Sequence, residues 1–264
     1  MAGSSDYHIS TRGSAGNPGM ILIHGFLGSS LDWLPVAESI DSRYNCILPD
    51  LPGHGKTPAS TMPFENQMEI LAGEIESRQQ SPSYLAGYSM GGRIALYLAL
   101  RYPGLFRHAV IISASPGLKT EEERKARRDS DALLASVIET DFESFLTDWY
   151  DLPLFSTLRR HPSFPELFEA RKRNRPDQLA AALRTLGTGS QPSLWEELGS
   201  GRIPLTFFAG EKDRKYVEIG RQMVNLYFSF NLEIFPQCGH TLHVENRALF
   251  IDRLLSSSTG NQSL

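Results

Sequence analysis

Residues 83–100 read SYLAGYSMGGRIALYLAL and place Ser89 at the centre of the pattern G-x-S-x-G. A short apolar run typical of a buried strand precedes the serine, and an apolar helical pattern follows it. A serine on such a strand-to-helix turn has a strained backbone, and a Cβ atom at a flanking glycine would collide with the strand or the helix. The pattern therefore predicts a nucleophile elbow, with the oxygen of Ser89 at a helix N-terminus, where negative charge is favoured.

Apolar runs bounded by turn residues recur along the chain, at 20–23, 44–48, 84–88, 109–112, 205–208 and 232–235. Because these runs lack polar alternation, they predict strands buried on both faces, as in a parallel sheet covered by helices. Helical patterns lie between or after them, at 64–79, 91–101, 215–228 and 243–255. This alternation predicts a doubly wound, mostly parallel α/β sheet.

The alternation stops between the fourth strand signal, at 109–112, and the fifth, at 205–208. Helical patterns occur there without strands. We interpret residues 116–202 as a helical cap inserted above the sheet. Residues 1–115 and 203–264 then form the core domain, and the polar tail 256–264 is expected to fray.

The composition excludes several classes of protein. The chain has 264 residues, of which 41% are hydrophobic, so it can bury one sizeable core. Its 26 basic and 30 acidic residues give a net charge of −4, which argues against a nucleic-acid binder. No apolar run approaches the roughly 18 residues that span a bilayer, and the first residues lack the apolar segment of a signal peptide.

The two cysteines, Cys46 and Cys238, are too few for a disulfide framework or a thiolate zinc site and are expected to pack in the core. They fit a reducing compartment, so we expect a soluble protein of the cytoplasm. His240 and His243 lack carboxylate or thiolate partners in a recognised spacing, so no metal and no cofactor are expected. The sequence gives no oligomeric state.

A serine hydroxyl becomes a nucleophile or a base only when a histidine takes its proton. His240 follows the last predicted strand, and Asp213 follows the strand before it, so the order Ser, Asp, His matches that of α/β-hydrolases. Glu211 is the alternative acid. His243, one helical turn after His240, is expected on the helix surface or in a local hydrogen bond.

An oxyanion site needs two N–H groups that converge on one point. The N–H of Met90, directly after the serine, is one candidate, and the N–H of Phe26 in the loop after the first strand is the other. His24 in the same loop is expected to support it. Asp50 and His54 belong to a glycine-rich turn and are not expected to be catalytic.

The segments HGFLG, DLPGHG, GYSMGG, GEKD and GH occur in this order with familiar separations, so the chain resembles the α/β-hydrolase superfamily over nearly its whole length. Arg93 lies one helical turn after Ser89. It can form either a structural salt bridge or a bidentate pair with a substrate carboxylate, and we favour the second role.

Further motifs are an elbow ending in GGR, a cap segment E-x-R-x-x-R-x-x-S-D, a D-W-Y, an arginine after an E-L run, and a Q-P-x-L. By these motifs the chain resembles one family, the 2-succinyl-6-hydroxy-2,4-cyclohexadiene-1-carboxylate synthases. The resemblance covers residues 20–255. It implies substrate contacts from Arg93, Arg127 and Arg171, with Tyr88 and Trp149 shaping the pocket. The basic run RKRNR at 171–175 leaves open whether Arg171, Arg173 or Arg175 faces the substrate.

The resemblance implies a lyase that eliminates pyruvate from a substrate with three carboxylates in menaquinone and phylloquinone biosynthesis. Three arginine forks suit such a tricarboxylate. A carbon–carbon or ester hydrolase of the same fold would use the same triad with water and show a burst from an acyl-enzyme. A third alternative is a small-molecule receptor with negligible turnover, for which we expect a mostly apolar pocket.

Overall fold

The computed structural model describes residues 7–227 and 229–259, and within them seven strands form one sheet. The strands are β1 (Ile9–Arg12), β2 (Gly19–Ile23), β3 (Asn45–Pro49), β4 (Ser83–Tyr88), β5 (Phe106–Ile112), β6 (Leu205–Gly210) and β7 (Phe230–Phe235). Their spatial order is β1-β3-β2-β4-β5-β6-β7. Only β1 runs antiparallel to its neighbour, so the predicted mostly parallel sheet is confirmed.

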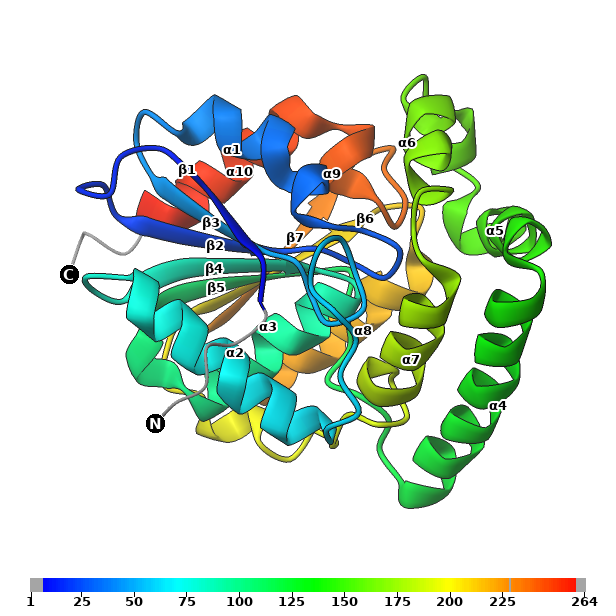
Figure 1. Ribbon diagram of the computed structural model, residues 1–264. Helices are drawn as coiled ribbons and strands as arrows, with labels where there is room; N and C mark the ends of the chain where they lie inside the picture. The colour runs from blue at the N-terminus through cyan, green and yellow to red at the C-terminus, as the bar shows by residue number, and fades with distance from the viewer. Residues whose placement is uncertain (1–6, 228, 260–264) are drawn as a thin grey trace.

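Helices cover both faces of this sheet (Figure 1). One face carries α1 (Leu34–Ile40), α9 (Leu242–Glu245) and α10 (Arg247–Thr259), and the other carries α2 (Phe64–Arg78), α3 (Met90–Arg101) and α8 (Arg214–Leu226). Each face has its own buried apolar cluster, because the strands carry apolar side chains on both sides. Short 3₁₀ turns complete the core and cap: η1 (Ser30–Trp33), η2 (Pro103–Leu105), η3 (Pro153–Phe155), η4 (Leu158–Arg160) and η5 (Leu198–Ser200).

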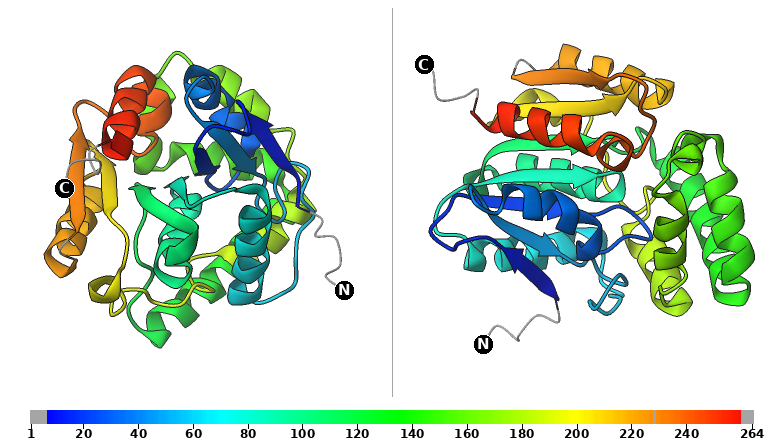
Figure 2. Two further views of the ribbon diagram at one scale, coloured as in Figure 1. Left: turned by 90° about the vertical axis from the view of Figure 1, so that its left-hand side faces the viewer. Right: turned by 90° about the horizontal axis from the view of Figure 1, so that it is seen from above.

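Four helices are inserted between β5 and β6, namely α4 (Glu121–Thr140), α5 (Phe142–Asp151), α6 (Phe164–Arg171) and α7 (Pro176–Leu186). They stand beyond one end of the sheet (Figure 2). A capping box between Thr120 and Glu123 fixes the start of α4. A third apolar cluster joins these helices to Leu27 of the loop after β2, so the inserted helices pack onto the carboxyl ends of the strands.

Several predicted boundaries were wrong. The pattern at 243–255 predicted one helix, but the chain breaks at Asn246 and forms α9 and α10. The expected frayed tail is helical as far as residue 259, and the remaining five residues lie outside the described part of the chain. β1 and α1 were not predicted, because β1 is partly exposed and lacks an apolar run and α1 has only seven residues. The predicted end of the helix at residue 228 also lies outside the described residues.

Cys46 and Cys238 are both buried, as predicted, and neither forms a disulfide. Burial raises the pKa of the Cys46 thiol to about 12 and that of the Cys238 thiol to about 11, so both remain protonated. Within the described residues, no helix is both long and apolar enough to cross a membrane.

Candidate active site

Ser89 lies on the predicted turn between β4 and α3, with φ of 52° and ψ of −109°. A non-glycine residue rarely adopts a positive φ, so this backbone is strained. A Cβ atom on Gly87 would collide with the carbonyl of Gly91, and one on Gly91 would collide with the carbonyl of Ile23. The flanking glycines therefore let the helix start directly against the neighbouring strands, and the serine projects from the carboxyl end of the sheet.

Three side chains from three strand ends meet at this point. His240 follows β7, and its Nε2 lies 3.1 Å from Ser89 Oγ. Asp213 follows β6, and its Oδ2 lies 2.7 Å from His240 Nδ1. His240 and Asp213 are both buried, so an aspartate that accepts from Nδ1–H leaves Nε2 free to take the serine proton.

The alternative acid, Glu211, does not take part in this chain of hydrogen bonds. Its carboxylate is half-exposed and accepts from the backbone N–H of Gln237.

Glu245 supports the loop that carries His240, a role that the sequence did not reveal. Its two oxygens accept from the N–H groups of Gly239 and Thr241, at 2.7 and 3.1 Å, so its carboxylate holds the backbone on both sides of His240.

The loop after β2 lies beside Ser89, because β2 and β4 are parallel neighbours and their carboxyl ends share one edge of the sheet. Phe26 lines the cavity at Ser89, and Met90 begins α3 directly after the serine. His24 donates from Nδ1 to the carbonyl of Gly25 and accepts from the N–H of Leu51 at Nε2. Burial lowers the pKa of His24, so it is a neutral brace for the loop, as expected.

Asp50 and His54 are also structural. Asp50 accepts from the N–H groups of Ser30 and Lys56 and so closes its own turn. Burial lowers the pKa of His54 to about 3.

A cavity of about 460 Å³ contains Ser89, and we call it the Ser89 cavity. Its walls include Tyr88, Trp149, Arg171, His243 and Arg247. Tyr88 donates to or accepts from Thr241 at 3.1 Å, and the ring of Trp149 packs edge-on against Phe26. The predicted pocket residues Tyr88 and Trp149 therefore do lie beside the serine.

The expectation for His243 was wrong. It is buried rather than on the helix surface, and its ring stacks on Trp33 and lies 4.4 Å from that of Tyr88, measured between centroids. Burial lowers its pKa to about 3, so it is neutral at physiological pH. A pattern of helix periodicity could not reveal this, because the helix breaks only three residues later.

Arg171 is the arginine of the basic run that reaches the Ser89 cavity, whereas Arg173 and Arg175 line a different one. Its guanidinium is buried and forms a bidentate pair with Asp32, both distances being 2.8 Å. Burial alone would lower the pKa of Arg171, but the carboxylate of Asp32 outweighs it and raises this pKa. The predicted fork for a substrate carboxylate therefore already has a carboxylate partner.

Arg93 and Arg127 do not line the Ser89 cavity. Arg93 is buried and donates to Gln191 and to the carbonyl of Leu186. Arg127 is half-exposed and pairs with Asp131 at 2.7 Å. Burial raises the pKa of Tyr216, whose ring lies 4.9 Å from that of His240, and the charges of Arg93 and Arg127 oppose this rise. Both arginines are therefore close enough to act on a neighbour of the triad.

Arg247 is a cavity residue that the sequence analysis missed. It begins α10, is exposed, and has no carboxylate within ion-pair distance among residues 7–227 and 229–259. The acidic residues of the same lining are Asp32 and Glu166, which lies on α6. Arg247 is thus a cation at this cavity whose charge is not neutralised by a direct partner.

The sheet order, the elbow and the hydrogen-bonded Ser89, His240 and Asp213 define a protein of the α/β-hydrolase class. A model of the alpha/beta hydrolase fold matches residues 18–247. A putative 2-succinyl-6-hydroxy-2,4-cyclohexadiene-1-carboxylate synthase of Bacillus subtilis is 36% identical, covering 92% of this chain and 91% of that protein. The chain belongs to this family of synthases, and the resemblance noted in the sequence is confirmed.

The chain is also similar to two further proteins. The structure of MenH from S. aureus superposes with a TM-score of 0.89 at 32% identity, covering 96% of this chain and 97% of that one. Protein PHYLLO, chloroplastic, of Arabidopsis thaliana is 35% identical over 90% of this chain. The chain spans only 16% of the length of that plant protein.

Proposed function

We propose that this protein is a lyase that eliminates pyruvate from 2-succinyl-5-enolpyruvyl-6-hydroxy-3-cyclohexene-1-carboxylate to give 2-succinyl-6-hydroxy-2,4-cyclohexadiene-1-carboxylate, in menaquinone or phylloquinone biosynthesis. The observation that carries the proposal is the hydrogen-bonded Ser89, His240 and Asp213 beside a cavity with cationic walls, in a chain 36% identical to a synthase of that name. Arginines at such a cavity suit a substrate with carboxylates, whereas a neutral ester has no charge for them to bind.

In the proposed reaction, His240 takes the proton of Ser89, and the serine oxygen removes the proton α to the succinyl ketone. The C–H electrons form an enolate, and the electrons then shift through the ring double bond. The ring C–O bond to the enolpyruvyl group breaks, and its electron pair leaves on the oxygen of the pyruvate enolate. The proton held by His240 then passes to this enolate, which becomes pyruvate, and the substrate proton taken by the serine oxygen restores the Ser89 hydroxyl. Asp213 holds the tautomer of His240 and stabilises its charged form.

Negative charge develops on the ketone oxygen during this step. The N–H groups of Phe26 and Met90 are proposed to donate to it, each donor contributing about 3 kcal/mol to transition-state stabilisation. Neither a metal nor a cofactor is part of this scheme.

The three substrate carboxylates need cationic partners. We assign Arg247 at the Ser89 cavity to one of them, in addition to the contacts from Arg93, Arg127 and Arg171 that the family implies. Arg171 binds a substrate carboxylate that either shares its guanidinium with Asp32 or takes the place of Asp32. Tyr88 and Trp149 shape the apolar side of the cavity.

We further propose that residues 116–202 act as a cap on a core formed by 1–115 and 203–264. The substrate is a small molecule. We place the enzyme in the cytoplasm, or in the plastid of a photosynthetic eukaryote.

The test is pyruvate release from the enolpyruvyl tricarboxylate by the purified protein, followed with lactate dehydrogenase and NADH. An activated neutral ester serves as the control substrate. Rapid release with little ester hydrolysis supports the lyase. Ester hydrolysis with a burst and no pyruvate release would transfer the assignment to a hydrolase, and inactivity toward both would favour the receptor.

A further inference from the structure

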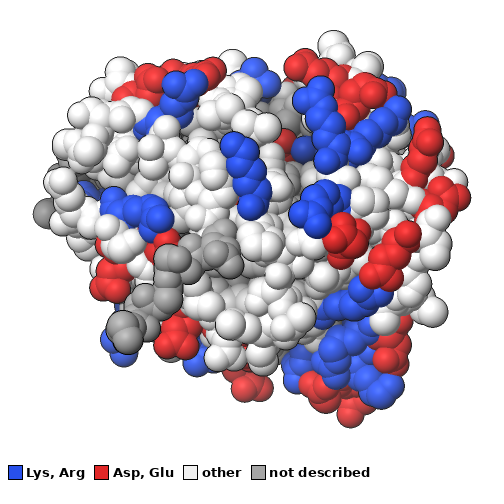
Figure 3. Space-filling view, in the orientation of Figure 1, with Lys and Arg blue, Asp and Glu red and all other residues white. Residues whose placement is uncertain are grey.

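A second cavity of about 460 Å³ lies between the turn after β3 and the connection from α6 to α7, and we call it the basic cavity. It shares Leu31, Asp32, Ala170 and Arg171 with the Ser89 cavity but does not contain the serine. Figure 3 shows basic side chains gathered over the end of α6 and the start of α7, on the face turned to the reader. One of its walls is formed by the basic run at 171–175. The proposed reaction uses only Arg171 of this run.

The charges of the basic cavity do not cancel. Its lining holds Lys56, Arg171, Arg173 and Arg175 against the single carboxylate of Asp32, which Arg171 already neutralises. Among residues 7–227 and 229–259, neither Lys56 nor Arg173 has a carboxylate within ion-pair distance. Three cations therefore face one hollow without a buried counter-charge.

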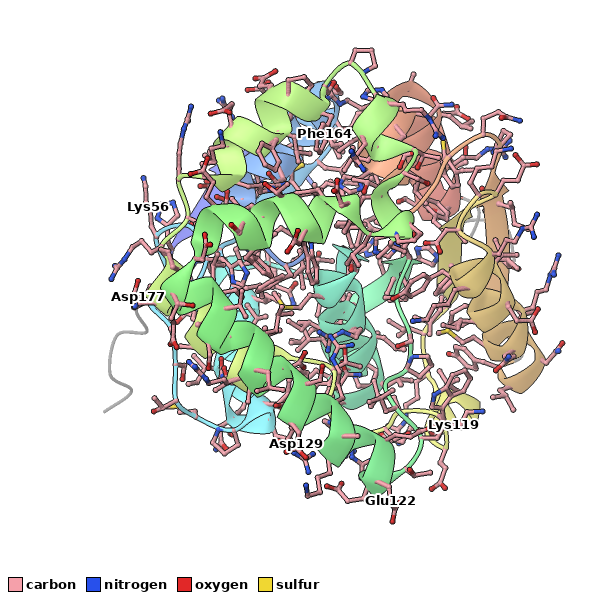
Figure 4. The ribbon with its side chains drawn as sticks, turned by 90° about the vertical axis from the view of Figure 1, so that its right-hand side faces the viewer. Lys56, Lys119, Glu122, Asp129, Phe164 and Asp177 are labelled. Carbon is pink, nitrogen blue, oxygen red and sulfur yellow. The ribbon has the colours of Figure 1, made fainter. Side chains whose placement is uncertain are left out.

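Arg175 does have a carboxylate neighbour, Asp177, at 3.2 Å. Both side chains are well exposed, and such a surface pair contributes little, so its guanidinium is free to turn toward a ligand. Asp177 itself is not part of the lining. In Figure 4, Lys56 lies at the same edge of the molecule as Asp177 and the start of α7.

The walls that carry these cations are fixed by hydrogen bonds. Asn174 Nδ2 donates to the carbonyl of Leu27 at 2.9 Å, which ties the α6–α7 connection to the loop after β2. The N–H of Ala59 donates to Gln178 Oε1 at 2.7 Å, which ties the other wall to α7. The walls of the cavity are thus held from both sides, next to the positions of Lys56, Arg173 and Arg175.

We propose that the basic cavity is a second anion site, which binds a small oxyanion with at least two negative charges. Guanidinium forks pair with carboxylates and phosphates alike, so a polycarboxylate metabolite and a phosphate compound share this chemistry. The hollow is too small and too local for a nucleic acid, and the chain as a whole is acidic, with a net charge of −4. The site does not depend on the proposed reaction, because Lys56, Arg173 and Arg175 all lie outside the lining of the Ser89 cavity.

The test is calorimetric titration of the full chain with propane-1,2,3-tricarboxylate and, separately, with pyrophosphate. The variant combines Lys56→Gln, Arg173→Gln and Arg175→Gln, all at exposed positions. The matched control combines Arg159→Gln, Arg184→Gln and Arg253→Gln, which removes the same charge at ion pairs elsewhere. Binding is read directly, so failure of the proposed reaction leaves this test intact.

We expect the variant to bind one anion fewer per chain, or to lose about tenfold or more in affinity, while the control binds like the wild type. Raising NaCl from about 50 to 300 mM should also weaken wild-type binding. Tighter binding of the tricarboxylate assigns the site to carboxylates, and tighter binding of pyrophosphate assigns it to phosphates.

Three results would overturn the site: the wild type binding neither probe, the variant binding like the wild type, or the control losing as much as the variant. If the combined variant does not fold, Arg173→Gln alone should still weaken binding about threefold, in a protein with an unchanged melting temperature. Unchanged affinity in that folded single variant would likewise reject the site.

Discussion

Asp32 and Arg171 form a bidentate ion pair, with both oxygen-to-nitrogen distances at 2.8 Å, in the wall shared by the Ser89 cavity and the basic cavity. The two residues are 139 positions apart, one in η1 and the other at the end of α6. The pair therefore joins the inserted helices to the core beside the proposed reaction centre.

Removal of one partner of this pair should destabilise the fold. Asp32→Ala leaves the buried guanidinium of Arg171 without a counter-charge, and we expect a loss of about 3 kcal/mol in the free energy of unfolding. Urea unfolding measures it. The control, Glu38→Ala, breaks the half-exposed pair with Arg12 and should cost less than about 1 kcal/mol. Equal costs in the two variants would show that the buried pair does not stabilise the protein.

Ser89 is the proposed base, so Ser89→Ala should reduce pyruvate release by about a thousandfold or more without loss of the fold. The folded state is checked by its melting temperature. We expect the variant still to bind product, because the cationic side chains are unchanged. Near-normal elimination by a folded variant would remove the serine from the proposed role.

Arg247 is proposed to receive a substrate carboxylate. Arg247→Gln removes this cation and should raise KM about tenfold or more with a smaller effect on kcat, since the contact is made in the bound substrate. The matched control is Arg253→Gln on the same helix, whose side chain lies near Glu233 and outside the Ser89 cavity. An unchanged KM in Arg247→Gln would show that the carboxylate binds elsewhere.

The stability should fall in acid because histidines are buried in their neutral form. Burial lowers the pKa of His243 to about 3, against about 6.5 in the unfolded chain. The unfolded state therefore binds more protons between these values. This contribution to stability is complete above pH 6.5 and is lost as the pH falls toward 3.

His243→Phe should flatten this dependence, by about 2 kcal/mol between pH 7 and pH 5. Unfolding free energies measured at several pH values test it. Trp33→Phe is the control, because it alters the same ring stack and leaves the histidine to titrate. A slope in His243→Phe equal to that of the wild type would contradict the buried neutral state.

The sequence by itself determined six of the seven strands, the elbow and the chain order of the triad. These features are local: apolar runs of strand length, glycines where a Cβ atom cannot fit, and polar residues directly after strands. Parallel strands bring their carboxyl ends to one edge, so Ser89, Asp213 and His240 could be expected to meet although they are far apart in the chain. The sequence favoured Asp213 over Glu211, and the hydrogen bond between His240 and Asp213 agrees with that preference.

The tertiary structure alone decided which charges are free. Arg93, Arg127 and Arg171 look alike in the sequence, yet each has a different partner, in Gln191, Asp131 and Asp32. His243 is a buried neutral ring because folding stacks it on Trp33, which is more than 200 positions away in the chain. Arg247, at the start of α10, lines the Ser89 cavity with residues from distant parts of the chain. Ion pairing and burial depend on atoms that folding brings together from distant positions, and no local pattern encodes them.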